Sequence, residues 1–140
     1  MTGQQWTPKI GEVYKMKFEG VGSEQSGWRP GLVFQNNVGN SHSPNIIALP
    51  LTTCLKKANQ PTHVIVRAED SGLPRDSMVL CENPGCMSKE RVGEYMTTLP
   101  KHYMKQVAAA NLLATSAIAY LDVNALVSAW KQASQLNDVG

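Results

Sequence analysis

The sequence predicts a small domain of mainly β structure with added helices, in which short antiparallel strands curl into a barrel that one helix closes. Two patterns support this fold class: short apolar runs bounded by turn residues over most of the chain, and a helical periodicity after Pro100. A length of 140 residues fits one domain with a modest core. Because such a domain is too small to enclose a deep cleft, a site is expected on one face or between subunits.

Five strands are expected in the first part of the chain. Residues 12–18 alternate between large apolar side chains and lysines, which is the pattern of a half-buried strand. The glycine- and serine-rich segment that follows, 20–30, is expected to be a loop. The other expected strands are short runs bounded by Asn, Gly, Ser or Pro, at 32–34, 46–51, 63–66 and 78–81.

The last third of the chain changes to helical periodicity. A single helical turn is expected at 88–95. After Pro100, a residue suited to a first helical turn, one long helix is expected to close the barrel. Its apolar stripe is formed by Tyr103, Val107, Ala110, Ala114, Ala117, Ile118 and Leu121.

A second helix is expected beyond this stripe, with Asp122 as its N-terminal cap. Its apolar face is formed by Val123, Leu126, Val127 and Trp130. We therefore divide the chain into a barrel with its closing helix, residues 1–121, and a C-terminal helical extension, residues 122–140.

Composition and charge limit the possible partners. The net charge is +2, so any contact with nucleic acid must come from a local basic patch. The N-terminus does not resemble a signal peptide, and no run of roughly 18 apolar residues is present, so we expect a cytoplasmic protein without a membrane partner. Cys54, Cys81 and Cys86 lack the spacing of a zinc site or a disulfide framework and are interpreted as free thiols. No metal or cofactor is expected.

The loop before the second strand carries the first group of candidate residues. Glu24, Gln25 and Arg29 lie in a segment that runs directly into a strand, where binding residues often concentrate. The planar, permanently charged guanidinium of Arg29 suits a phosphate, although a surface ion pair with Glu24 is an equal alternative. Trp28 can stack on a base of a single strand or anchor a protein partner.

The end of the third expected strand provides a second group. Thr52 and Thr53 place hydroxyl groups next to the charges of Lys56 and Lys57, which together could form the floor of an anion site. The alternative is that the threonines only favour strand structure and the lysines are solvated. Glu82, at the end of a strand, can accept a proton or can simply face solvent.

The three histidines do not form a catalytic pattern in the sequence. His63 begins an aliphatic strand after Pro61 and is interpreted as structural, and His42 and His102 have no constellation around them. The sequence contains no Walker loop, dinucleotide fingerprint, Ser/His/Asp set or metal cluster.

Several motifs, taken in order, resemble the MazF/PemK/Kid toxins of type II toxin-antitoxin systems. They are GEVY, GSEQSGWRPGLVFQN, IIALPLTT, PTHV and DSMVLCEN, and the likeness extends over residues 9–118. The segment at 22–30 is the most specific part. The resemblance implies a barrel related to SH3 and to the gyrase poison CcdB, a homodimer, metal-independent and sequence-specific cutting of single-stranded RNA, and a cognate antitoxin protein.

The same resemblance implies roles for individual residues. Arg29 matches the catalytic arginine of the family, Thr52 its catalytic hydroxyl residue, and Glu24 a loop glutamate that is needed for activity. Glu82 falls where relatives carry a carboxylate that acts as the base in the Kid branch. Further RNA contacts are expected from Gln25, Trp28, Asn36, Thr53, Lys56 and Lys57.

Two departures from the family pattern keep other functions open. Leu80 and Gly85 stand where relatives carry arginines. One alternative is a CcdB-like toxin that binds a protein target such as gyrase without catalysis. The other is an inactive barrel that serves as an interaction module.

Overall fold

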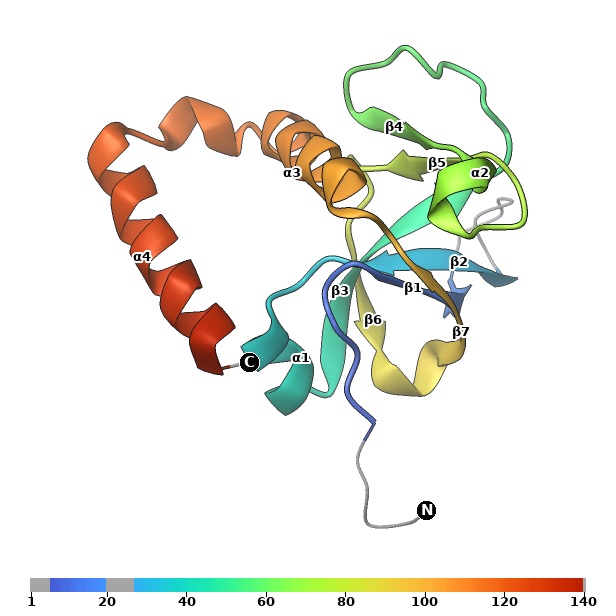
Figure 1. Cartoon of the computed structure of the whole chain (residues 1–140), viewed down its shortest axis with the longest axis horizontal. Coiled ribbons are helices and arrows are strands. Elements are labelled where there is room, and N and C mark those ends of the chain that lie inside the picture. Colours follow the sequence, from blue (N-terminus) through green and yellow to red (C-terminus); the bar gives the residue numbers. More distant parts are fainter. Residues whose placement is uncertain (1–5, 20–26, 140) are drawn as a thin grey trace.

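The computed structural model of the chain describes residues 6–19 and 27–139. Within these residues the strands are β1 (Glu12–Phe18), β2 (Gly27–Val33), β3 (Asn45–Thr52), β4 (His63–Val66), β5 (Ser77–Leu80), β6 (Gly85–Ser88) and β7 (Val92–Thr98). The helices are α1 (Asn37–His42), α2 (Ala68–Ser71), α3 (Lys101–Ala114) and α4 (Val123–Val139), with 3-10 turns η1 (Lys89–Arg91) and η2 (Ala117–Tyr120). The sheet forms one side of the molecule and the C-terminal helices extend away from it (Figure 1).

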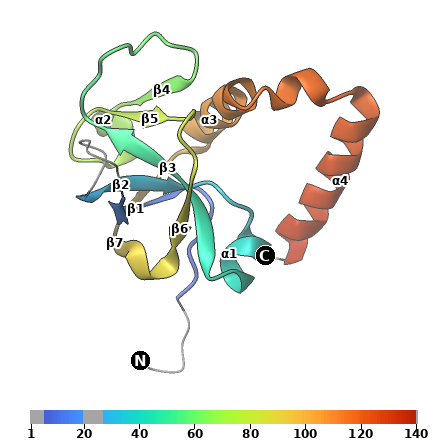
Figure 2. The same ribbon diagram turned by 180° about the vertical axis from the view of Figure 1, so that it is seen from behind.

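The strands pair antiparallel in the order β4-β5-β3-β2-β1-β7, and β6 pairs with β3 beside this path. β3 is shared between two parts of the sheet, because its first half pairs with β6 and its last two residues, Leu51 and Thr52, pair with β5. Figure 2 shows β3 crossing the middle of the molecule between the β4–β5 pair and β6. The antiparallel sheet with C-terminal helices is therefore confirmed.

Closure of this sheet into a barrel is not seen in the described residues, because no strand pairing joins β4 to β7. Instead, α3 packs over this open side. Its buried residues Tyr103, Val107 and Ala110 join a core that also contains Val13 of β1 and Val66 of β4. A second core cluster on the other part of the sheet includes Met16, Ile46 and Met87. Burial of each large aliphatic side chain contributes roughly 1.5–3 kcal/mol.

Two segments that were expected to be irregular or helical are strands. Gly27 to Pro30 belong to β2 and not to a loop, since β2 pairs with β1 from Gly27 opposite Phe18 to Leu32 opposite Val13. The expected helical turn at 88–95 is also wrong beyond the short η1, because residues from Val92 onward pair with β1 as β7. In both cases pairing with a distant strand overrides the local turn or helix signal.

The long closing helix is shorter than expected. α3 ends at Ala114, and Ser116 has a left-handed backbone with φ of 59°, which a continuous helix does not allow. The stripe is buried only as far as Ala110, while Ile118 in η2 is 56% exposed. The expected cap of the next helix is confirmed, because Asp122 Oδ1 accepts a hydrogen bond from the backbone N–H of Ala125 at 2.7 Å.

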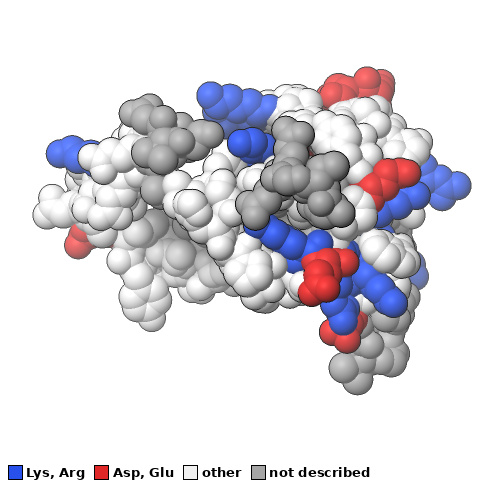
Figure 3. Space-filling view, turned by 90° about the horizontal axis from the view of Figure 1, so that it is seen from below, with Lys and Arg blue, Asp and Glu red and all other residues white. Residues whose placement is uncertain are grey.

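α4 stands apart from the sheet, and its far end returns to α1 (Figures 1 and 2). Its side chains from Val123 to Ser134 are all exposed, including its apolar face. In the view of Figure 3 most charged side chains gather on the side of the sheet, and few lie over the C-terminal helices. Among the described residues, no helix has the length and apolar character needed to cross a membrane.

One cysteine is part of the core. Cys81 follows β5 directly and is fully buried, whereas Cys54 and Cys86 are exposed. Burial raises the pKa of the Cys81 thiol to about 12, and the neighbouring charge of Glu82 acts in the same direction. Since the thiolate is the reactive form, Cys81 is expected to be inert in the folded protein.

Truncation tests the contribution of α4 to stability. A chain that ends at Leu121 is expected to unfold cooperatively, with a free energy of unfolding within about 1 kcal/mol of the full chain, because no residue of α4 up to Gln135 belongs to the core. Urea denaturation followed by circular dichroism measures the difference. Val107→Ala in the full chain is the contrasting variant and is expected to cost about 2 kcal/mol. Loss of cooperative unfolding on truncation would contradict the expectation.

Thiol alkylation tests the burial of Cys81. At mildly alkaline pH, iodoacetamide is expected to modify Cys54 and Cys86 in the native protein and Cys81 only after denaturation. The raised pKa of Cys81 keeps its thiol protonated and unreactive in the folded protein. Mass spectrometry of the intact protein counts the modified cysteines. Three modifications of the native protein at equal rates would show that Cys81 is accessible.

Candidate active site

A cavity of about 550 Å³ opens where the end of β3 meets β2, β4 and β5. Its walls come from segments that are distant in sequence. The lining residues are Arg29, Thr52, Thr53, Cys54, Lys56, Lys57, His63, Met78, Leu80 and Glu82. Six of the ten residues proposed from the sequence as catalytic or RNA-binding therefore surround one cavity: Arg29, Thr52, Thr53, Lys56, Lys57 and Glu82.

The sheet register explains why Arg29 and Thr52 line the same cavity. β2 and β3 are antiparallel, with Gly31 opposite Pro50. Continuing this register by two residues along each strand brings Arg29 opposite Thr52, and the period of two places both on the face of Gly31 and Pro50. Both side chains are half-buried, so each is anchored in the sheet while its polar end reaches the cavity.

The hydroxyl group of Thr52 already makes one hydrogen bond within the protein. Thr52 Oγ1 accepts a hydrogen bond from the backbone N–H of Cys54 at 3.1 Å, which fixes the turn that leaves β3. A hydroxyl group has one proton to donate and two lone pairs. Because the Cys54 contact uses a lone pair, the proton of Thr52 remains available for an anionic oxygen in the cavity.

The loop after β3 carries two lysines at the rim of the cavity. Lys56 and Lys57 are both exposed, and together with Arg29 they give this part of the cavity a positive charge. Lys57 has a left-handed backbone with φ of 58°, which is uncommon for a residue other than glycine. Its carbonyl accepts hydrogen bonds from the backbone N–H of Gln60 at 3.0 Å and from His63 Nδ1 at 2.9 Å.

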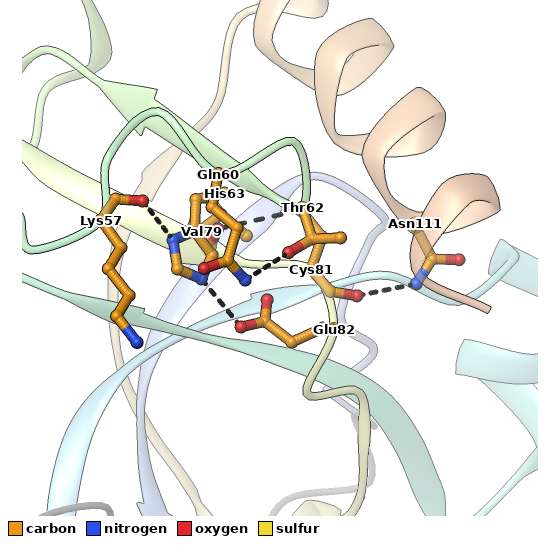
Figure 4. A network of polar contacts seen from close by, with 8 residues as sticks. All are labelled: Lys57, Gln60, Thr62, His63, Val79, Cys81, Glu82 and Asn111. Atoms are coloured by element: carbon orange, nitrogen blue, oxygen red, sulfur yellow. Dashed lines mark hydrogen bonds and ion pairs between the residues drawn. The ribbon is translucent and has the colours of Figure 1, made fainter.

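His63 was interpreted from the sequence as structural, but it lies in the cavity wall and contacts a candidate catalytic residue. His63 Nε2 lies 2.8 Å from Glu82 Oε2, and the side chains are 7% and 31% exposed (Figure 4). β4 and β5 pair with His63 opposite Leu80. Glu82 is therefore the diagonal neighbour of His63 on the same face, a relation that follows from the sequence once this strand pair is assumed.

Two further contacts fix the segment that carries Glu82. The backbone N–H of Cys81 donates to the carbonyl of Thr62 at 3.0 Å, and Asn111 of α3 donates from Nδ2 to the carbonyl of Cys81 at 3.1 Å (Figure 4). Among the described groups, Oε1 of Glu82 is buried and has no hydrogen-bond partner. One carboxylate oxygen is thus held by His63 and the other is shielded.

The remaining candidate residues lie elsewhere or outside the described residues. Trp28 is not part of the cavity lining, and its ring lies so close to Gly93 that a β-carbon there would come within 2.9 Å. Asn36 caps α1, with Oδ1 accepting from the N–H of Gly39 at 2.8 Å. Glu24 and Gln25, and with them the alternative ion pair between Glu24 and Arg29, lie outside the described residues. The described residues contain no cluster of three metal-ligating side chains.

Comparison with known proteins identifies the family of the chain. Residues 9–113 match the family described as PemK-like, MazF-like toxin of type II toxin-antitoxin system. Endoribonuclease EndoA of Bacillus subtilis is 41% identical over 100 residues, which cover 71% of this chain and 86% of EndoA.

Solved structures show the same fold. MazF from Deinococcus radiodurans superposes with a TM-score of 0.69 at 23% identity, over 80% of this chain and 99% of that one. A mycobacterial endoribonuclease in complex with its cognate antitoxin superposes with a TM-score of 0.64 at 25% identity, over 78% and 95% of the two chains. The chain therefore belongs to the PemK-like, MazF-like family of toxins of type II toxin-antitoxin systems.

Proposed function

We propose that this chain is an endoribonuclease toxin that cuts single-stranded RNA at specific sequences. The observation that carries the proposal is the cavity in which Arg29, Thr52 and Glu82 come together from three parts of the sheet. The identity of 41% to EndoA supports the same activity. The cavity also weighs against a CcdB-like binder or an inactive module, since neither of these needs a guanidinium, a hydroxyl and a carboxylate around one space.

The reaction uses the RNA's own nucleophile. The 2′-hydroxyl attacks the adjacent phosphorus, so that the bond from the 2′-oxygen to phosphorus forms and the bond from phosphorus to the 5′-oxygen breaks. Glu82, or Glu24 of the loop, accepts the 2′-hydroxyl proton. The leaving 5′-oxygen receives a proton from Arg29 or from a water molecule that Arg29 holds. The products are a 2′,3′-cyclic phosphate and a 5′-hydroxyl end.

Arg29 and Thr52 stabilise the charge that grows on the phosphoryl oxygens. Arg29 provides a planar guanidinium, and the hydroxyl group of Thr52 donates a hydrogen bond to a phosphate oxygen. Each such donor contributes roughly 3–4 kcal/mol to the transition state, by analogy with oxyanion-hole deletions. Lys56 and Lys57 attract the RNA backbone at the rim. No metal is needed for this chemistry, because the nucleophile and the positive charge come from the RNA and the protein.

The partners follow from the family. A mycobacterial relative was solved in complex with its cognate antitoxin, and we propose that this chain also has one. We expect an apolar and acidic tail of that antitoxin to lie across residues 20–30. We also propose a homodimer that acts on mRNA in the cytoplasm. Thr53 extends the hydroxyl surface next to Thr52, and Gln25, Trp28 and Asn36 contact bases outside the cavity. The catalytic unit is residues 1–121, with residues 122–140 as an extension.

Substitution of Arg29 tests the site. Arg29→Ala is expected to lower the rate of RNA cutting by about 10²–10³ or more and to leave the fold intact, because the charge on the phosphoryl oxygens is no longer balanced. Cleavage of a long RNA is followed on a gel, with circular dichroism to verify folding. Arg75→Ala, an exposed arginine away from the cavity, is the matched control. Wild-type cutting by folded Arg29→Ala would refute the assignment, and growth arrest without RNA cutting would favour a protein target.

The nucleophile and the absence of a metal requirement are tested together. An RNA with a single 2′-deoxy sugar on the 5′ side of the cut is expected to resist cleavage, whereas EDTA is expected to leave the rate on normal RNA unchanged. Fragment ends are identified by mass spectrometry as cyclic phosphate and 5′-hydroxyl. Cutting of the deoxy-substituted strand would exclude attack by the 2′-hydroxyl, and inactivation by EDTA would show that a metal takes part.

A further inference from the structure

The hydrogen bonds of His63 fix the position of one of its protons. The carbonyl of Lys57, 2.9 Å from Nδ1, can only accept a hydrogen bond, so Nδ1 must carry a proton. Nε2 then faces Glu82 Oε2 at 2.8 Å. Two lone pairs at this distance would repel each other, so exactly one proton lies between the two atoms. It belongs either to an imidazolium beside a carboxylate or to a neutral carboxyl beside a neutral imidazole.

The pair is held rigidly on the cavity wall. The Nδ1 contact anchors the imidazole to the strained backbone of Lys57, and the side chain is only 7% exposed. Glu82 is fixed through Cys81, which is bonded to Thr62 and to Asn111. Glu82 is more exposed than His63 and lines the same cavity as Arg29 and Thr52.

We propose that His63 and Glu82 act as one proton-sharing pair, in which His63 positions Glu82 to take the 2′-hydroxyl proton of the RNA; this inference rests on the proposed function. With the shared proton on Nε2, Glu82 is a carboxylate and accepts the 2′-hydroxyl proton as the 2′-oxygen bonds to phosphorus. The 5′-oxygen leaves with a proton from Arg29 or its bound water, and Glu82 then returns its proton to solvent. His63 is thus a positioning residue that does not touch the RNA.

His63 also holds the Glu82 side chain in place. Among the described groups Glu82 Oε1 has no partner, so the contact of Oε2 with His63 is the one hydrogen bond found for this carboxylate. Without the imidazole, the carboxylate loses this contact and with it the orientation towards the attacking 2′-hydroxyl. Loss of His63 should therefore lower kcat and leave KM nearly unchanged, because binding of the RNA depends on Arg29 and the lysines.

The first test compares variants of the full chain on the same RNA. His63→Gln keeps an N–H for Glu82 but lacks the imidazole that bridges Glu82 and the Lys57 carbonyl. We therefore expect kcat to fall by about 10–100-fold, as for residues that orient a catalytic group, while KM changes less than about 3-fold. His42→Gln, on an exposed residue of α1, is the matched histidine control.

A double-mutant cycle measures whether the two residues act as a unit. His63→Gln in a Glu82→Gln background is expected to lower kcat less than about 2-fold further, because the base that His63 positions is already absent. Multiplicative losses from the two substitutions would overturn the pair. Retention of the wild-type kcat by His63→Gln would overturn it as well.

NMR spectroscopy of the protein without RNA tests which nitrogen of His63 carries a proton. In ¹⁵N spectra of the imidazole groups, the resonances that vanish in His63→Gln identify His63. Its Nδ1 is expected to carry a proton, because this nitrogen faces the Lys57 carbonyl. An imidazole protonated on Nε2 alone would overturn the inference. Failure of the wild-type protein to cut any RNA would instead refute the proposed function and the catalytic use of the pair, whatever the spectra show.

Discussion

The antiparallel pairing of β3 with its neighbours is the constraint on which the site depends. β3 pairs with β2 on one side and with β5 on the other, and β5 in turn pairs with β4. Through these three pairings, four strands deliver one polar side chain each to the same place: Arg29, Thr52, His63 and, just past β5, Glu82. A shift of one residue in any register would turn the corresponding side chain to the opposite face.

The cavity combines cationic side chains with a carboxylate that has its own hydrogen-bond partner. Arg29, Lys56 and Lys57 carry positive charge towards the space that a phosphodiester would occupy. Glu82 lines the same cavity, and its Oε2 is 2.8 Å from Nε2 of His63. The hydrogen-bonded partner of this carboxylate is thus an imidazole, and the three cationic side chains remain directed at the phosphate.

Most of the chain serves to hold this arrangement. The core under α3 fixes the ends of β4 and β5, and Asn111 extends from the same helix to the carbonyl of Cys81, one residue before Glu82. α4 has no such role, because its side chains up to Ser134 face solvent and its neighbour is α1. α4 also lies outside residues 9–113, the part of the chain that matches the family.

The sequence alone was sufficient for features set by local pattern. The alternation in β1, the run of β4, the cap at Asp122 and the motif around Arg29 are all visible in neighbouring residues, and they predicted the family and most of the cavity lining. The strand nature of residues 27–30 and of β7, and the end of α3 at Ala114, were decided by pairing and packing with distant segments. The same is true of His63: its partner Glu82 is far away along the chain, and only the β4–β5 register brings the two together. The physical reason is that strands pair through backbone hydrogen bonds, which every residue except proline can form. The side-chain pattern of one strand therefore does not specify which strand lies beside it.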